Sequence, residues 1–161
     1  MTKLPREEYL QSLDKKPASA GMLFRNTQNE ILLVEPTYKE NWDIPGGVVE
    51  KNESPRKTAK REIKEELSLD IEPGALLCID YKKLKDSDMD SYQMIFDGGI
   101  LSDEQIALIR IDPEELRSCS FVSNAKAATL LRPTMNKRLN AAIDAQQNHC
   151  TYYLEGGQII N

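Results

Sequence analysis

Residues 47–69, GVVEKNESPRKTAKREIKEELSL, decide the fold, because they encode one amphipathic helix with a well-marked start. Ser54-Pro55 is typical of a helix beginning, with serine as the N-cap and proline in the first helical position. Ala59, Ile63 and Leu67 then recur every four residues, which predicts an apolar stripe facing a core. We therefore predict a helix from Pro55 to Leu67 that packs through this stripe.

The charged residues of this helix place three carboxylates on one face. Glu62, Glu65 and Glu66 stand at positions i, i+3 and i+4, which span an arc of about 100°. Like charges at this spacing repel each other, and a hard divalent cation such as Mg²⁺ offsets that repulsion through oxygen ligands. Arg61 lies one turn before Glu65 and can hold its carboxylate in one orientation. A solvated charged face is the alternative reading of such a helix, so the flanking residues must decide.

The flanks favour a binding site. Gly46 and Gly47 allow the backbone to approach a ligand closely, and their carbonyl groups are possible metal ligands. Glu50 and Glu53 add two more carboxylates near the start of the helix. This combination indicates a metal and phosphate site.

The stretch resembles the Nudix box, which reads Gly, five residues, Glu, seven residues, Arg-Glu, an aliphatic residue, any residue, Glu-Glu, any residue, Gly and an aliphatic residue. The residues that fall at the required positions are Gly47, Glu53, Arg61, Glu62, Ile63, Glu65, Glu66 and Leu69. Six exact matches arise by chance with a probability on the order of 10⁻⁵. One position departs, because Ser68 stands where the family has its last glycine. That position follows the helix end, where a left-handed conformation is common and costs serine about 1 kcal/mol.

The resemblance implies a fold and an activity. The expected fold is α/β, a Nudix-like α/β/α sandwich around a mixed β-sheet, formed by a single domain over residues 1–161. The expected activity is metal-dependent hydrolysis of a pyrophosphate linkage in a nucleoside diphosphate derivative, which is a nucleotide-sugar, a dinucleotide or a nucleoside triphosphate. The alternative is a non-catalytic Nudix-like module that binds a nucleotide and regulates a partner. Such modules usually lose box acids, and this chain keeps them all.

The resemblance also assigns the site residues. Mg²⁺, or Mn²⁺ in its place, is expected to bind the three helix carboxylates and the backbone of Gly47. Substrate contacts are expected at Gly46, Gly47 and Trp42. The expected catalytic set is Glu53, Arg61, Glu62, Glu65, Glu66 and Glu104. Of these, Glu53 and Arg61 support the metal ligands, and Glu104 is the acid expected from a later loop, because it follows a strand that ends near Leu101.

The rest of the chain predicts a mixture of strands and helices. Residues 1–15 are polar and predict a short, loosely held helix, and Trp42–Gly47 is expected to lack regular structure. Asp112–Leu116 is expected to form a short helical turn, and the alanine-rich stretch 124–147 to be helical with an interruption at Pro133. Strands are expected at Ala18–Phe24, Ile31–Val34, Ala75–Leu84, Ser91–Leu101 and Ile106–Ile111, with a hairpin at Thr151–Ile160.

The net charge and composition of the chain limit the classes of partner that it can bind. The net charge of −5 argues against a general nucleic-acid binder, and no apolar run is long enough for a membrane span. Three scattered cysteines without metal spacing are typical of reduced thiols, which favours a cytoplasmic location. We expect a small nucleotide-like substrate and no membrane partner, and a homodimer remains open.

Two other motifs have ordinary explanations. Asp86, Asp88 and Asp90 match the first ligand positions of a calcium loop, but the glycine that such a loop requires is Ser91. We therefore expect a solvated acidic loop there. His149 is the single histidine and lies near the end of the last predicted helix, where a cation favours the helix dipole. No catalytic role is expected for it.

Overall fold

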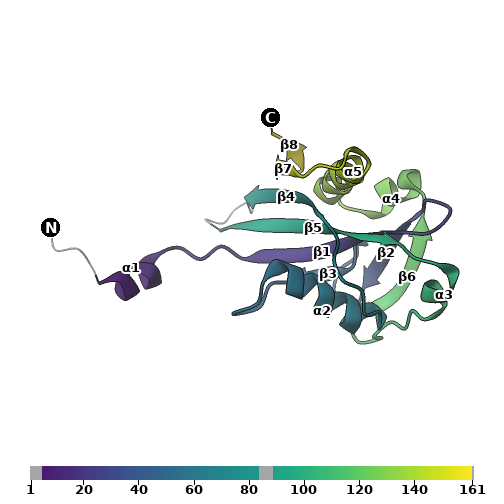
Figure 1. Ribbon diagram of the computed structural model, residues 1–161, viewed down its shortest axis with the longest axis horizontal. Helices are drawn as coiled ribbons and strands as arrows, with labels where there is room; N and C mark the ends of the chain where they lie inside the picture. The colour runs from purple at the N-terminus through teal and green to yellow at the C-terminus, as the bar shows by residue number, and fades with distance from the viewer. Residues whose placement is uncertain (1–4, 84–88, 161) are drawn as a thin grey trace.

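The computed structural model describes residues 5–83 and 89–160. An eight-stranded mixed sheet forms the centre of the described part, and helices cover both of its faces (Figure 1). The strands are β1 (Ala18–Arg25), β2 (Ile31–Pro36), β3 (Gly46–Val48), β4 (Leu76–Lys83), β5 (Asp90–Ile100), β6 (Leu116–Val122), β7 (Tyr152–Glu155) and β8 (Gln158–Ile159). The helices are α1 (Arg6–Ser12), α2 (Pro55–Leu67), α3 (Asp103–Ala107), α4 (Asn124–Leu130) and α5 (Pro133–Asn148). This arrangement confirms the predicted α/β sandwich.

The strand order is β6-β2-β1-β5-β4-β7-β8, and the short strand β3 pairs with β1 outside this path. β1 pairs with β5 in parallel, whereas its partners β2 and β3 are antiparallel, so the sheet is mixed. β1 therefore lies at the centre of the sheet and carries β3 along its first half. This pairing fixes Gly46 and Gly47 beside the middle of the sheet.

Each face of the sheet has its own apolar core. Ala59, Ile63 and Leu67 of α2 are fully buried in one cluster, as the four-residue spacing predicts. Leu139 and Ala142 of α5 belong to the other cluster. Consecutive residues of β1 alternate between these two clusters, because neighbouring side chains of a strand point to opposite faces.

The ends of α2 follow from its sequence. The Ser54 side chain accepts a hydrogen bond from the Lys57 N–H, and Pro55 occupies the first turn. The helix ends at Leu67, and its C-cap residue Ser68 is left-handed with φ 59°. The Ser68 hydroxyl donates to the carbonyl oxygen of Arg110 at 3.1 Å. This bond gives the serine a partner at the position where the Nudix box has glycine.

Several predicted elements are confirmed. β1 and β2 form the expected antiparallel pair, and β4 and β5 form another. β7 and β8 form the C-terminal hairpin, with Gly156 and Gly157 in its turn. Pro133 separates α4 from α5 and takes the first helical position of α5, where its missing N–H is harmless.

The segment after β5 corrects the sequence prediction. Ile106–Ile111 was expected to be a strand, but α3 and a loop replace it. Ser102 and Gln105 form a capping box that starts α3, and this local signal outweighs the apolar residues that follow. β6 was not predicted, because the exposed Arg117 and Ser120 and the half-buried Ser118 give it a weakly apolar pattern.

The glycine pair also corrects the prediction. Gly46 and Gly47 were expected to lack regular structure, yet both lie in β3. Gly46 adopts φ 146° and packs directly against Gly21 of β1, where a Cβ atom would lie 2.4 Å from the Gly21 Cα. The glycines therefore permit a close strand pairing that a side chain would prevent.

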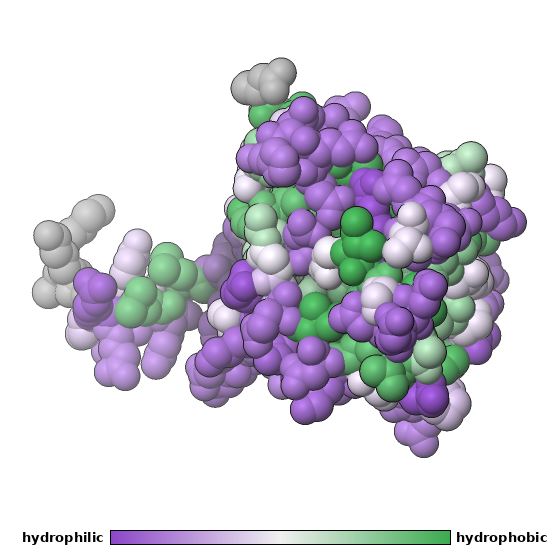
Figure 2. Space-filling view, turned by 45° about the vertical axis from the view of Figure 1, so that its right-hand side comes forward, coloured by the Kyte–Doolittle hydropathy of each residue, from purple (hydrophilic) through white to green (hydrophobic). Residues whose placement is uncertain are grey.

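The N-terminal helix α1 projects away from the sheet (Figure 1). None of its residues is buried, as expected for a loosely held segment. Tyr9 and Leu10 of this helix are exposed, and Figure 2 shows hydrophobic atoms in green on the projecting arm. No helix among residues 5–83 and 89–160 is long and apolar enough to cross a bilayer. The calcium-loop residues Asp86 and Asp88 lie outside the described residues.

Candidate active site

Three carboxylates from two segments meet at one end of α2. Glu62 and Glu66 come from the helix, and Glu115 comes from the loop before β6. One oxygen atom from each lies within 4.8 Å of the others. We call these residues the acidic cluster. The structure thus brings together two of the three helix carboxylates that the sequence predicts and adds a third that the sequence did not reveal.

Glu66 is the most buried member, with 5% of its surface exposed. Its carboxylate accepts a hydrogen bond from the Gly46 N–H at 2.8 Å. Burial raises the pKa of Glu66 to about 8, although the Gly46 bond opposes this rise. The nearby charges of Glu62, Glu115 and Asp43 raise it further. The buried carboxylate therefore lacks a compensating positive charge within the described residues.

Glu62 is half-buried, and burial likewise raises its pKa. Its carboxylate accepts a hydrogen bond from the Arg61 guanidinium at 2.8 Å, which partly offsets the effect of burial. Glu115 is exposed, but its backbone position is fixed. Its carbonyl accepts from the Thr37 N–H at 2.8 Å, and its own N–H donates to Asp112 at 3.1 Å.

Arg61 holds the carboxylates around the cluster. Its guanidinium donates to both oxygens of Glu53 at 3.0 Å and to Glu65 at 2.8 Å, in addition to Glu62. The two hydrogen bonds from Arg61 to Glu53 lower the pKa of Glu53 to about 2, and a further bond from the Thr58 hydroxyl acts in the same direction. Glu65 is half exposed and lies outside the acidic cluster in this arrangement. Glu53 and Arg61 thus occupy positions that suit the supporting role expected of them.

Gly47 leaves room for the acidic cluster. A Cβ atom on Gly47 would lie 2.2 Å from Oε1 of Glu62, which is far inside van der Waals contact. The backbone of β3 therefore passes directly against a cluster carboxylate. This close approach is the physical reason for glycine at the first position of the box.

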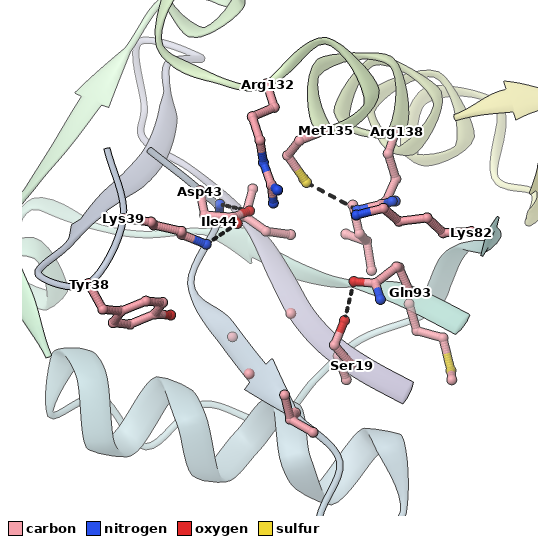
Figure 3. Close-up of a pocket in the computed structure, with 17 residues that line it drawn as sticks. Ser19, Tyr38, Lys39, Asp43, Ile44, Lys82, Gln93, Arg132, Met135 and Arg138 are labelled. Carbon is pink, nitrogen blue, oxygen red and sulfur yellow. Dashed lines mark hydrogen bonds and ion pairs between the residues drawn. The ribbon is translucent and has the colours of Figure 1, made fainter. Parts of the chain in front are cut away.

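A cavity of about 200 Å³ opens on the other side of β3 (Figure 3). It is lined by residues of β1, β3, β4, β5 and the start of α5, and by the loop before β3. Gly46 and Gly47 belong to this lining. The same two residues contact the acidic cluster, so β3 separates the cavity from the cluster and touches both.

Two predicted residues lie elsewhere. Trp42 packs against the core beneath α4 and α5 and bridges to Leu131, and the aromatic side chain lining the cavity is Tyr38. Glu104 is exposed in the first turn of α3, where a hydrogen bond from Ser102 lowers its pKa. Among the described residues, Glu115 and not Glu104 completes the acidic cluster. The only sequence signal for Glu115 was the Asp112-Pro113 turn, which fixes where the chain re-enters the sheet.

The acidic cluster fits a divalent cation. Its donors are carboxylate oxygens, which are the ligands that Mg²⁺ and Mn²⁺ prefer. The raised pKa of Glu66 shows that its ionised form is disfavoured when no cation is bound. A bound cation reverses this balance, because it supplies the missing positive charge.

Two stretches of the chain are similar to known sequences. A 59-residue stretch is 44% identical to the "Putative ADP-ribose pyrophosphatase YjhB" of Bacillus subtilis (strain 168), covering 37% of this chain and 27% of that protein. A 121-residue stretch is 29% identical to the "Putative 8-oxo-dGTP diphosphatase" of the same organism, covering 75% of this chain and 76% of that protein. The chain thus matches about a quarter of the first relative and about three quarters of the second.

Solved structures agree in fold. The MutT protein from Methanosarcina mazei Go1 superposes with a TM-score of 0.66 at 25% identity, covering 86% of this chain and 99% of that one. The NUDIX domain of Shewanella oneidensis NrtR, solved with ADP-ribose, gives a TM-score of 0.68 at 16% identity, covering 89% and 99%. A sequence model described as the NUDIX domain matches residues 15–145. The predicted resemblance is thereby confirmed, and the chain belongs to the NUDIX domain family.

Proposed function

We propose that this chain is a metal-dependent pyrophosphohydrolase that cleaves the diphosphate linkage of a nucleotide-like substrate. The observation that carries the proposal is the acidic cluster joined to the cavity through Gly46. The cluster suits a cation that binds the diphosphate, and the cavity suits the organic part of the same molecule. The relatives named as pyrophosphatase and diphosphatase support this reaction class.

Glu62, Glu66 and Glu115 would hold the cation, and Glu65 is a further candidate ligand. When bound, a divalent cation supplies positive charge that offsets the negative charge of the phosphate oxygens during hydrolysis. Arg61 keeps Glu62 and Glu65 oriented, since it donates a hydrogen bond to each. Phosphoryl transfer depends mainly on such positioning and charge compensation.

Glu115 takes the place that the sequence assigned to Glu104, that of an acid supplied by a later loop. Its exposed side chain and fixed backbone put a carboxylate at the solvent edge of the acidic cluster. A carboxylate in that position can accept a proton from an attacking water. Glu104 lacks such a position, because it lies outside the acidic cluster and receives a hydrogen bond from Ser102 instead.

The non-catalytic alternative is a nucleotide-binding regulatory module. A module of that kind needs the cavity but has no use for a buried carboxylate whose pKa is raised to about 8. Retaining such a group is unfavourable for stability in the absence of a cation. The acidic cluster therefore favours the hydrolase over the regulatory module.

The proposed substrate is a small nucleotide derivative, with nucleotide-sugars, dinucleotides and nucleoside triphosphates as the classes to compare. Mg²⁺ is the proposed cofactor and Mn²⁺ its substitute. All three cysteines are free thiols, which supports a reducing, cytoplasmic location. The exposed apolar residues of α1 are compatible with a homodimer.

The test is a panel of nucleoside diphosphate derivatives assayed for product release with Mg²⁺, with Mn²⁺ and with EDTA. We expect hydrolysis of at least one member with either metal and none with EDTA. Hydrolysis that is unaffected by EDTA would refute the metal requirement. Tight binding of panel members without turnover in either metal would favour the regulatory module.

A further inference from the structure

The cavity has a charge opposite to that of the protein. The chain carries a net charge of −5. The charged residues that line the cavity are four cations, Lys39, Lys82, Arg132 and Arg138, and one anion, Asp43. Figure 3 shows the side chains of all four cations at the cavity, with Arg138 on α5 and Arg132 just before its first residue. A cation-rich cavity in an acidic protein indicates an anionic ligand.

Two of these cations are already neutralised. Lys39 forms an ion pair with Asp43, with Nζ 2.6 Å from Oδ2. Arg138 donates from Nε and Nη2 to the fully buried Asp80, at 2.8 Å and 2.6 Å. The Gly157 N–H donates to the other oxygen of Asp80 at 3.0 Å and completes this buried network. These two pairs leave no net positive charge for a ligand.

The other two cations have no such partner. Within the described residues, neither Lys82 nor Arg132 makes a side-chain hydrogen bond or an ion pair, and both face the cavity. Partial burial lowers the pKa of Lys82, and the charges of Arg132 and Arg138 lower it further. The carboxylates of Asp80 and Asp43 act in the opposite direction but more weakly.

The start of α5 strengthens the positive field. α5 has 16 residues and begins at Pro133 with no side-chain cap on its free N–H groups. Arg132 and Met135, at this end of the helix, line the cavity. The positive end of the helix dipole thus adds to the charges of Lys82 and Arg132 on the same wall.

We propose that Lys82 and Arg132 form a subsite for an anionic group of the substrate, separate from the diphosphate held at the acidic cluster. The substrate class is then a diphosphate derivative whose organic part carries an additional phosphate or carboxylate. The inference rests on the proposed function, because that function places the diphosphate on the far side of β3. Lys82 and Arg132, which lack partners among the described residues, would favour such a substrate over a diphosphate derivative without the additional anionic group.

Matched pairs of compounds test the subsite. UDP-glucuronate and UDP-glucose differ by one carboxylate, whereas coenzyme A and dephospho-coenzyme A differ by one phosphate. ADP-ribose 2′-phosphate and ADP-ribose form a third pair. For each pair, kcat/KM is measured with Mg²⁺, and binding is measured by calorimetry in EDTA, where no hydrolysis is expected. The first pair reports a carboxylate and the other two report a phosphate.

The variants are Lys82→Gln, Arg132→Gln and their combination. The matched control is Lys83→Gln, because Lys83 is the next residue of β4, is exposed and does not line the cavity. Adjacent strand residues point to opposite faces, so this control removes the same charge from the other side of the sheet. Lys82→Arg keeps the charge and should retain the preference. Circular dichroism and thermal unfolding establish that every variant is folded.

We expect the wild type to prefer the anionic member of at least one pair by about tenfold or more, as a charge-assisted hydrogen bond provides. Lys82→Gln/Arg132→Gln should remove this preference, because it should lower kcat/KM for the member with the additional anionic group at least about tenfold more than for the member without it. The proposal is overturned if no pair shows a preference for its anionic member, or if the double variant keeps it. An equal loss for both members of a pair also overturns it, because the cations would then bind the diphosphate itself.

The two proposals fail in different ways. Preferential binding of anionic members in EDTA, without hydrolysis in any metal, would refute the proposed function and keep the subsite. Metal-dependent hydrolysis without any preference would keep the function and refute the subsite. If no compound binds or is hydrolysed, both proposals are wrong for these substrate classes.

Discussion

Glu66 of α2 accepts a hydrogen bond from the backbone of Gly46 in β3, at 2.8 Å. This bond links the helix that carries most of the acidic cluster to the strand that lines the cavity. Gly46 is held in turn by its pairing with Gly21 of β1. A shift of α2 would therefore change both the cluster and the cavity wall, so the two parts of the site are mechanically connected.

Glu66→Gln should remove most of the activity. The amide keeps the size of the side chain but lacks the negative charge needed to hold a divalent cation. Loss of one strong electrostatic contact in a catalytic site lowers kcat by factors of hundreds. The measurement is kcat with saturating Mg²⁺ on a hydrolysed substrate, at equal folded fractions. Retention of more than about half of the wild-type activity would show that Glu66 is not a metal ligand.

Glu115→Gln and Glu104→Gln separate the two candidates for the later acid. Glu115 lies in the acidic cluster and Glu104 does not. We expect Glu115→Gln to lower kcat by about tenfold to a hundredfold, as removal of a general base or a ligand does. Glu104→Gln is the control and should stay within about twofold. A larger loss of kcat in Glu104→Gln than in Glu115→Gln would support Glu104 as the later acid, as the sequence predicted.

The stability of the metal-free protein should fall as the pH rises. The folded pKa of Glu66 is about 8, compared with an ordinary value of 4.5, so between these values the folded state binds more protons than the unfolded state. The free energy of unfolding in EDTA should therefore decrease by about 1–3 kcal/mol from pH 5 to pH 8. Urea unfolding at several pH values measures this change.

Glu66→Gln should flatten this pH dependence, since the amide does not titrate. Mg²⁺ should oppose the decrease, because a cation binds the ionised carboxylates and stabilises the folded state most at high pH. An identical pH dependence in the wild type and in Glu66→Gln would mean that another group causes it.

Gly47→Ala should damage activity more than stability. The added Cβ would lie 2.2 Å from the Glu62 carboxylate, which is the movable end of a side chain. Glu62 can rotate away at little cost to the fold, but it then leaves the acidic cluster. We expect kcat/KM to fall by roughly tenfold or more, with a change in Tm of only a few degrees. Lys51→Ala is the control, because Lys51 is exposed and belongs to neither the acidic cluster nor the lining of the cavity.

The sequence predicted the parts of the molecule whose signals are local. Ser54 and Pro55 mark the start of α2, and the apolar stripe that begins at Ala59 identifies its buried face. The carboxylates at Glu62 and Glu66 follow from the same helix, because a spacing of four residues fixes their common face. Arg61 reaches Glu65 as the spacing predicts.

Contacts between segments that are distant in the chain could not be predicted from the sequence. Glu115 joins the acidic cluster only because β6 pairs with β2, and that pairing depends on packing that no local pattern encodes. Glu104 was chosen because it follows β5, yet the capping box at Ser102 turns that segment into α3. Lys82 and Arg132 are 50 residues apart and meet at one cavity only when β4 and α5 pack together.

The position of β3 between the acidic cluster and the cavity has an evolutionary consequence. The carboxylates of the acidic cluster come from α2 and the loop before β6, whereas much of the cavity wall comes from β4, β5 and α5. If the proposed subsite is correct, substitutions at Lys82 or Arg132 would alter the choice of substrate while the acidic cluster is inherited unchanged. Descendants of one such gene could then diversify in substrate specificity without an inactive evolutionary intermediate.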